Sequence, residues 1–192
     1  MVHIKTYDAP PLNLGEIARY TGSRELSDAA VADMLSLCEK ELSYKVCYIE
    51  LPLKISDGLC DFGLFSVSSR DLAKNLRKCD RVLLFATTVG VGIDRLITKY
   101  SRLSPSRAVM LDAFGSERIE ALCDAFCEDV KGLHNVALVP RFSPGYGDLP
   151  LETQRSIISV LNTPKNIGVS LTDSLLLTPT KSVTAFVGIK KG

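Results

Sequence analysis

The hydrophobic positions of this 192-residue chain change their spacing several times along the sequence. In six stretches apolar residues recur at intervals of three and four, the period of an amphipathic helix. The stretch from 106 to 132 is long and apolar enough to predict a central, largely buried helix. The predicted helices cover residues 14–21, 27–42, 68–78, 93–100, 106–132 and 151–161.

Other stretches carry β-branched and aromatic residues in short runs, which is typical of strands. Residues 81–88 (RVLLFATT) are continuously apolar in the middle, which predicts an interior strand covered on both faces. A glycine-rich turn is expected at 58–63. The predicted strands cover residues 45–52, 62–67, 81–88, 170–178 and 182–190, and the last two flank Pro179-Thr180-Lys181 as a carboxyl-terminal β-hairpin.

Local helices mixed with a hairpin favour an α+β fold with a mainly antiparallel sheet packed against helices. A doubly wound parallel sheet is the second choice. The length fits one domain over residues 1–192, with a helical amino-terminal part over 1–45 and an α+β core over 46–192.

Charge and composition narrow the classes of function. The formal net charge is +1, from 23 basic and 22 acidic side chains, so no basic field attracts nucleic acid. Apolar runs are too short to span a membrane, and no secretory signal opens the chain, so we expect a cytoplasmic protein. Six cysteines without any C-x-x-C pair are expected to remain thiols that fill the core.

Several candidate sites have a plainer explanation. The glycine turn Thr87–Gly92 could hold an anion, but it lacks the spacing of a dinucleotide or phosphate loop and is read as a strand-to-helix turn. Cys123 and Cys127 share a helix face, but they lack a full ligand set, so no metal site is predicted. A thiol enzyme using either cysteine is a third hypothesis, which the apolar helix face disfavours. Without G-x-S-x-G, a serine hydrolase has little support, and no catalytic residue is predicted.

The segment Arg141-Phe-Ser-Pro-Gly-Tyr-Gly-Asp148 carries the most chemistry. Its arginine offers a planar fork that matches a carboxylate, its glycines let a ligand approach the backbone, and its tyrosine can stack on a base. These parts suit a zwitterionic nucleoside. The residues alone leave open a buried turn whose arginine bonds carbonyl groups.

Residues Arg141–Gln154 (RFSPGYGDLPLETQ) resemble the R-x-x-P-G-Y segment and following helix of the activation domain of vitamin B12-dependent methionine synthase. Downstream, GVSLTDS at 168–174 and then Pro179 with Ser182-Val183 are similar to that family's closing hairpin. Upstream, residues 112–122 resemble the helix before the motif. The resemblance extends from about Val82 to the end of the chain.

The resemblance implies a ligand, S-adenosylmethionine, and roles for individual residues. Arg141 would hold the ligand's carboxylate, and Glu120 would add a polar contact from the long helix. Asp8 and Glu16 are candidates for the acidic residue that meets the ammonium group. The loop around the adenosine would consist of Ser143, Pro144, Gly145, Tyr146 and Gly147.

In the resembled enzyme this domain presents S-adenosylmethionine to an oxidised cobalamin while flavodoxin supplies an electron. No cobalamin-binding D-x-H-x-x-G signature is present, so the corrinoid is expected on a partner, either a methionine synthase core or a corrinoid methyltransferase. The resemblance therefore implies a stand-alone activation protein within a methionine synthase system. The alternative is a docking module for a corrinoid protein with a vestigial ligand pocket.

Overall fold

The computed structural model describes residues 1–23 and 25–190. The helices are α1 (Leu14–Thr21), α2 (Asp28–Cys38), α3 (Arg70–Leu76), α4 (Gly92–Leu103), α5 (Pro105–His134), α6 (Thr153–Leu161) and α7 (Thr163–Asn166). The strands are β1 (His3–Tyr7), β2 (Tyr44–Pro52), β3 (Lys54–Ser56), β4 (Leu59–Asp61), β5 (Ser66–Ser68), β6 (Cys79–Thr88), β7 (Ser170–Leu171), β8 (Leu177–Thr178) and β9 (Ser182–Lys190). None of these helices is both long and apolar enough to cross a membrane.

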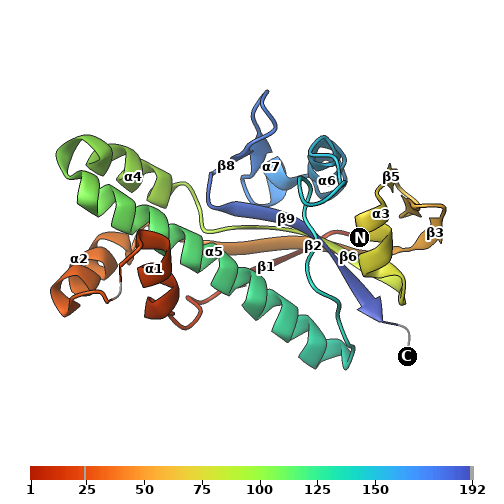
Figure 1. Cartoon of the computed structure of the whole chain (residues 1–192), viewed down its shortest axis with the longest axis horizontal. Helices are drawn as coiled ribbons and strands as arrows, with labels where there is room; N and C mark the ends of the chain where they lie inside the picture. Colours follow the sequence, from red (N-terminus) through yellow and green to blue (C-terminus); the bar gives the residue numbers. More distant parts are fainter. Residues whose placement is uncertain (24, 191–192) are drawn as a thin grey trace.

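The main sheet has the strand order β1-β2-β6-β9, and all its pairings are antiparallel. Figure 1 shows the long α5 crossing the sheet, with α1, α2 and α4 beside its amino-terminal half. The predicted α+β class, the mainly antiparallel sheet and the long central helix are confirmed. The small β3-β4-β5 sheet lies apart from α5, beside α3.

Alternation along β6 divides the core into two layers. Leu83 and Phe85 pack with α1, α2 and α5 on one face of the sheet. Val82, Leu84 and Ala86 pack with α3 and α6 on the other. Successive side chains of a strand point to opposite faces, so a continuously apolar strand is buried on both sides. The prediction of an interior strand at 81–88 is confirmed.

Helix ends follow local capping chemistry. The side chain of Ser27 caps α2 by accepting from the N–H of Ala30, as the sequence predicts. The helix predicted over 68–78 is shorter at its start, where Ser69 is the N-cap of α3 and its side chain accepts from the N–H of Leu72. Asn162, in the left-handed region, ends α6 at Leu161 as predicted, and Pro164 lies in the first turn of α7.

Three elements depart from the sequence predictions. The amino-terminal part contains α1 and α2 as expected, but also β1, a largely exposed edge strand with little apolar patterning. The turn expected at 58–63 contains β4, paired with both β3 and β5. A carboxyl-terminal hairpin is present, formed by β7 with β8, while β9 pairs with β6.

Candidate functional site

The loop that leads from α5 to α6 contains residues 141–148, here called the arginine loop. Its start is joined to β9, because the N–H of Phe142 donates to the carbonyl of Phe186 at 2.9 Å and the reverse bond has the same length. Gly145 and Gly147 then take φ values of 90° and 53°, where a side chain would be strained. The loop is irregular, as predicted, but its backbone path is tightly specified.

The far end of the arginine loop is fastened to the start of α3. The carboxylate of Asp148 accepts hydrogen bonds from the Ser69 hydroxyl, from the N–H of Arg70 at 2.8 Å and from the N–H of Asp71 at 3.2 Å. The Ser69 bond, followed by the backbone bonds, lowers the pKa of Asp148. A Cβ at Gly147 would lie 2.3 Å from the Asp71 carboxylate, which would have to shift, and the positive φ of 53° would strain any side chain there. The loop is therefore held at both ends.

Arg141 lies between the arginine loop and α5. Its Nη2 donates to Glu120 Oε2 at 2.8 Å, and its Nη1 donates to Asp124 Oδ1 at 2.7 Å. Burial lowers the pKa of this guanidinium, but the nearby Cys123, Asp124 and Glu120 raise it, and the net shift is upward. The side chain is 25% exposed, so a charged and oriented guanidinium remains accessible from the cavity described next.

A cavity of about 550 Å³ opens between the arginine loop, α5, α6 and β9. Apart from the two ammonium candidates, the resemblance implicates seven residues, and five of them line the cavity, namely Glu120, Arg141, Ser143, Pro144 and Tyr146. Gly145 and Gly147 do not line it; they form the turns that shape the loop. The remaining lining residues are Phe142, Gln154, Leu177, Ser182, Val183 and Thr184.

The walls of this cavity differ in character. Tyr146 is 69% exposed at the rim, while Pro144 is buried. Gln154, at the start of α6, is only 7% exposed, and its Oε1 has no hydrogen-bond partner among the described residues. A buried amide oxygen without a partner is uncommon, because its desolvation is not offset. The cavity thus offers a cation and apolar surface, and the largely buried Gln154 forms part of its wall.

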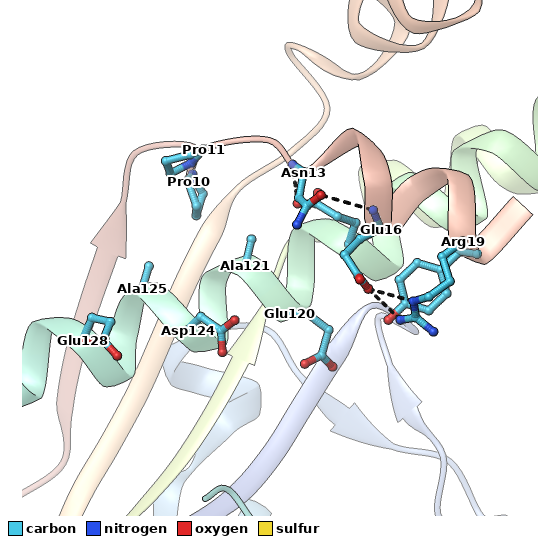
Figure 2. A pocket seen from close by; sticks show the side chains of 12 residues that line it. Pro10, Pro11, Asn13, Glu16, Arg19, Glu120, Ala121, Asp124, Ala125 and Glu128 are labelled. Atoms are coloured by element: carbon cyan, nitrogen blue, oxygen red, sulfur yellow. Dashed lines mark hydrogen bonds and ion pairs between the residues drawn. The ribbon is translucent and has the colours of Figure 1, made fainter. Parts of the chain in front are cut away.

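An acidic groove of about 620 Å³ adjoins the cavity on the other side of Glu120. Glu120, Asp124 and Glu128 stand four residues apart along α5 and form one stripe. Figure 2 shows Ala121 and Ala125 pointing toward the segment with Pro10 and Pro11, and the three carboxylates turned away from that segment. On α1, Glu16 pairs with Arg19 at 2.6 Å. Of the two candidate ammonium ligands, Glu16 lines the groove and Asp8 does not.

Comparison with known proteins gives two findings. Residues 138–191 match the model of the family described as vitamin B12 dependent methionine synthase, activation domain. A crystal structure of the MetH reactivation domain bound to AdoHcy has the same fold, with a TM-score of 0.70 at 16% identity, over 98% of this chain and 78% of that one. The fold is that of a methionine synthase activation domain. No curated protein matches the chain.

The other candidate sites in the sequence find no support in the structure. Burial raises the pKa of the Cys123 thiol to about 12, and burial is also the main cause of the raised pKa of Cys127. Such thiols are weak nucleophiles at neutral pH. In the turn after β6, a Cβ at Gly92 would lie 2.1 Å from the carbonyl oxygen of Glu41, so close packing explains this glycine. Among the side chains that the structure describes, no cluster could hold a metal ion.

Sequence reasoning missed several residues that line the cavity or pair with Arg141. Asp124 could have been found, because it lies one helical turn after Glu120 and therefore on the same face. Gln154 was part of the quoted motif but carried no signal of burial. Ser182 and Thr184 reach the cavity only because β9 pairs with β6 and passes behind the arginine loop.

Proposed function

We propose that this chain binds S-adenosylmethionine in the cavity at the arginine loop and presents its methyl group to a cobalamin carried by a partner. The observation that carries the proposal is the convergence of Glu120, Arg141, Ser143, Pro144 and Tyr146 on one cavity. Its volume lies within the range of small-molecule sites, roughly 300–1,000 Å³. The AdoHcy bound by the MetH reactivation domain, which shares the fold, supports a ligand of this class.

Arg141 would bind the ligand's carboxylate. Its two terminal nitrogens already donate to Glu120 and Asp124, two carboxylates that are 48% and 72% exposed. A ligand carboxylate can replace one of these solvated partners with little loss, because exposed ion pairs contribute little free energy. The displaced Glu120, together with Glu16 in the adjoining groove, would then be available to the ligand's ammonium group.

The arginine loop would place the nucleoside. Pro144 and Phe142 supply apolar surface, and the exposed ring of Tyr146 can cover a base at the rim. Because the loop is fixed to β9 and to α3, little ordering is needed on binding. The same rigidity would keep the sulfonium methyl group in a fixed orientation at the open side of the cavity.

The partner's cobalamin would supply the reduced cobalt that accepts the methyl group. When the sulfur–methyl bond breaks, the sulfur keeps the bonding electrons, and S-adenosylhomocysteine is the product. The preceding reduction needs one electron, for which a flavodoxin-like donor is the expected source. The partner would be a methionine synthase core or a corrinoid methyltransferase in the cytoplasm, where the six free cysteines stay reduced.

Calorimetric titration of S-adenosylmethionine into the purified protein tests the proposal. We expect measurable binding, and we expect Arg141→Ala to lose it by roughly tenfold or more, since a hydrogen bond to a charged group contributes about 1.5–3 kcal/mol. Arg155→Ala is the matched control, because Arg155 is an exposed arginine on α6 that does not line the cavity.

Two outcomes would contradict the proposal. If the unmodified protein gives neither heat nor a thermal shift at millimolar ligand, the cavity is not an S-adenosylmethionine site, and a docking module with a vestigial pocket becomes the better explanation. If both arginine variants bind as the unmodified protein does, Arg141 does not hold the carboxylate and the ligand lies elsewhere.

A further inference from the structure

The guanidinium of Arg141 has two carboxylate partners, and only one of them lines the ligand cavity. Nη2 donates to Glu120, which lines the cavity together with Arg141. Nη1 donates to Asp124, which does not line the cavity. Asp124 lines a neighbouring pocket of about 380 Å³, to which Arg141 also contributes. The guanidinium therefore borders both spaces, with Glu120 at the cavity and Asp124 at the neighbouring pocket.

This placement gives the two carboxylates different relations to a bound ligand. A ligand in the cavity reaches the guanidinium where Glu120 already occupies Nη2, so its carboxylate competes with Glu120. Asp124 lies outside the space that the ligand fills, and its side chain is 72% exposed to solvent. The bond of 2.7 Å between Nη1 and Asp124 Oδ1 can therefore persist in the complex.

A persisting bond at Nη1 would orient the rest of the guanidinium. An arginine side chain has many rotamers, and fixing one of them on binding costs conformational entropy. Because the guanidinium is planar, a partner at one nitrogen restricts the direction in which the other nitrogens point. A binding group that its neighbours already hold in place loses less freedom when the ligand arrives.

We propose that Asp124 is a positioning residue: it keeps its bond to Nη1 in the complex and directs Nη2 of Arg141 toward the ligand's carboxylate. Glu120 is the partner that the ligand displaces, and Asp124 touches no ligand atom. This inference rests on the proposed binding of an S-adenosyl ligand and assigns a further residue to the same site.

Parallel calorimetric titrations with S-adenosylhomocysteine and 5′-methylthioadenosine test the inference. Both compounds contain the same nucleoside and a thioether and have no net charge, but only the first has a carboxylate. The unmodified protein should prefer S-adenosylhomocysteine by roughly tenfold or more. In Asp124→Ala the affinity for S-adenosylhomocysteine should fall roughly two- to fivefold, the effect of an exposed ion pair, and the affinity for methylthioadenosine should not change.

Matched variants separate orientation from charge. Glu128→Ala removes the same charge one turn further along α5, where Glu128 pairs with Lys131 and not with Arg141, so it should keep the full preference. Asp124→Asn retains an oxygen acceptor at the same position, so it should lose less affinity than Asp124→Ala. The loss in Asp124→Ala should persist for the analogue of S-adenosylhomocysteine that lacks the amino group, because that analogue still carries the carboxylate.

The failures are distinguishable. An unchanged or increased affinity of Asp124→Ala for S-adenosylhomocysteine overturns the positioning role while S-adenosyl binding stands. An equal loss for methylthioadenosine would make Asp124 merely structural, and an equal loss in Glu128→Ala would leave only the charge of the stripe. A loss that requires the ligand's amino group would make Asp124 a direct contact, which also overturns the inference. If the unmodified protein binds neither compound, the proposed function and this inference fail together.

Discussion

Two arginines meet carboxylates of α5, and they differ in almost every physical respect. Arg118 is 3% exposed and pairs with Glu117, its equally buried neighbour, at 2.5 Å. Arg141 is 25% exposed and pairs with Glu120 and Asp124 one and two turns further along the helix. One pair lies inside the protein beside α1, and the other borders the cavity.

The contacts of the two guanidinium groups explain the difference. Arg118 also donates to the carbonyls of Pro10 and Pro11 at 2.6 and 2.8 Å, so it fastens the amino-terminal segment to α5. The partners of Arg118, which are Glu117 and the carbonyls of Pro10 and Pro11, belong to the fold itself. The partners of Arg141 are solvated carboxylates that a ligand can replace. Whether an ion pair stabilises the fold or serves ligand binding thus depends on its burial and on whether its partners can be exchanged. It does not depend on residue type.

The largest effect is expected from breaking the buried pair. Arg118→Met removes the cation and leaves the Glu117 carboxylate uncompensated in the protein interior. The free energy of unfolding should fall by about 3–5 kcal/mol, measured by urea denaturation. The double variant Glu117→Gln with Arg118→Met should lose less, because no buried charge remains. Equal losses in the two variants would show that packing, and not the unpaired charge, is responsible.

The same substitution at Arg141 should have a small effect on stability and a larger effect on ligand binding. Arg141→Met removes two ion pairs whose carboxylates are 48% and 72% exposed, so the free energy of unfolding should change by less than about 1 kcal/mol. Affinity for S-adenosylhomocysteine should fall by roughly tenfold or more. A large loss of stability in Arg141→Met would remove the contrast and make Arg141 a structural residue.

The parts of the fold that the sequence predicted well are those with strong local signals. The period of three and four marked α5, the continuous apolar run marked β6, and Ser27 marked the start of α2. The edge strand β1 was missed because it buries little and owes its structure to pairing with β2. The pairing of β9 with β6 was missed because register with a distant strand leaves no local pattern.

The candidate site likewise combines features that have a local sequence signal with features that only the tertiary structure determines. The arginine loop was recognisable from its residue types and its resemblance, and four of its implicated residues line the cavity together with Glu120 of α5. The buried position of Gln154 depends on the packing of α6, and the pairing of Arg141 with Asp124 depends on the path of the arginine loop past α5. No short motif encodes either. The anchoring of Asp148 to α3 also joins segments 77 or more residues apart.

The bonds between Asp148 and the start of α3 also bear on Arg141, because they hold the loop on which Arg141 lies. Ser69→Ala removes the N-cap of α3 and one of the bonds to Asp148. We expect the free energy of unfolding to fall by about 1 kcal/mol, the usual cost of losing a cap. Ligand affinity should fall less than in Arg141→Met, since two backbone N–H groups still hold Asp148.

Calorimetry and urea denaturation of Ser69→Ala measure both quantities. Thr98→Ala, which removes a hydroxyl that bonds a main-chain carbonyl within α4, is a control far from the arginine loop. An affinity loss as large as that of Arg141→Met would mean that the cap, and not the arginine itself, limits binding.

The smallest expected effect is a pH dependence at Asp148. Its pKa is lowered in the folded protein, first by the Ser69 hydroxyl and then by the N–H groups of Arg70 and Asp71. A carboxyl whose folded pKa lies below its unfolded value of about 3.9 contributes stability above that value, and the contribution is lost as the pH falls through the folded pKa. Asp148→Asn cannot ionise, so it lacks this contribution at every pH.

The melting temperature of the unmodified protein should therefore exceed that of Asp148→Asn at pH 7, and the difference should shrink as the pH is lowered to 3. Other carboxylates titrate in both proteins and cancel in the difference. A difference that stays constant across this range would show that Asp148 holds the arginine loop by its shape and neutral hydrogen bonds, and that its charge contributes nothing.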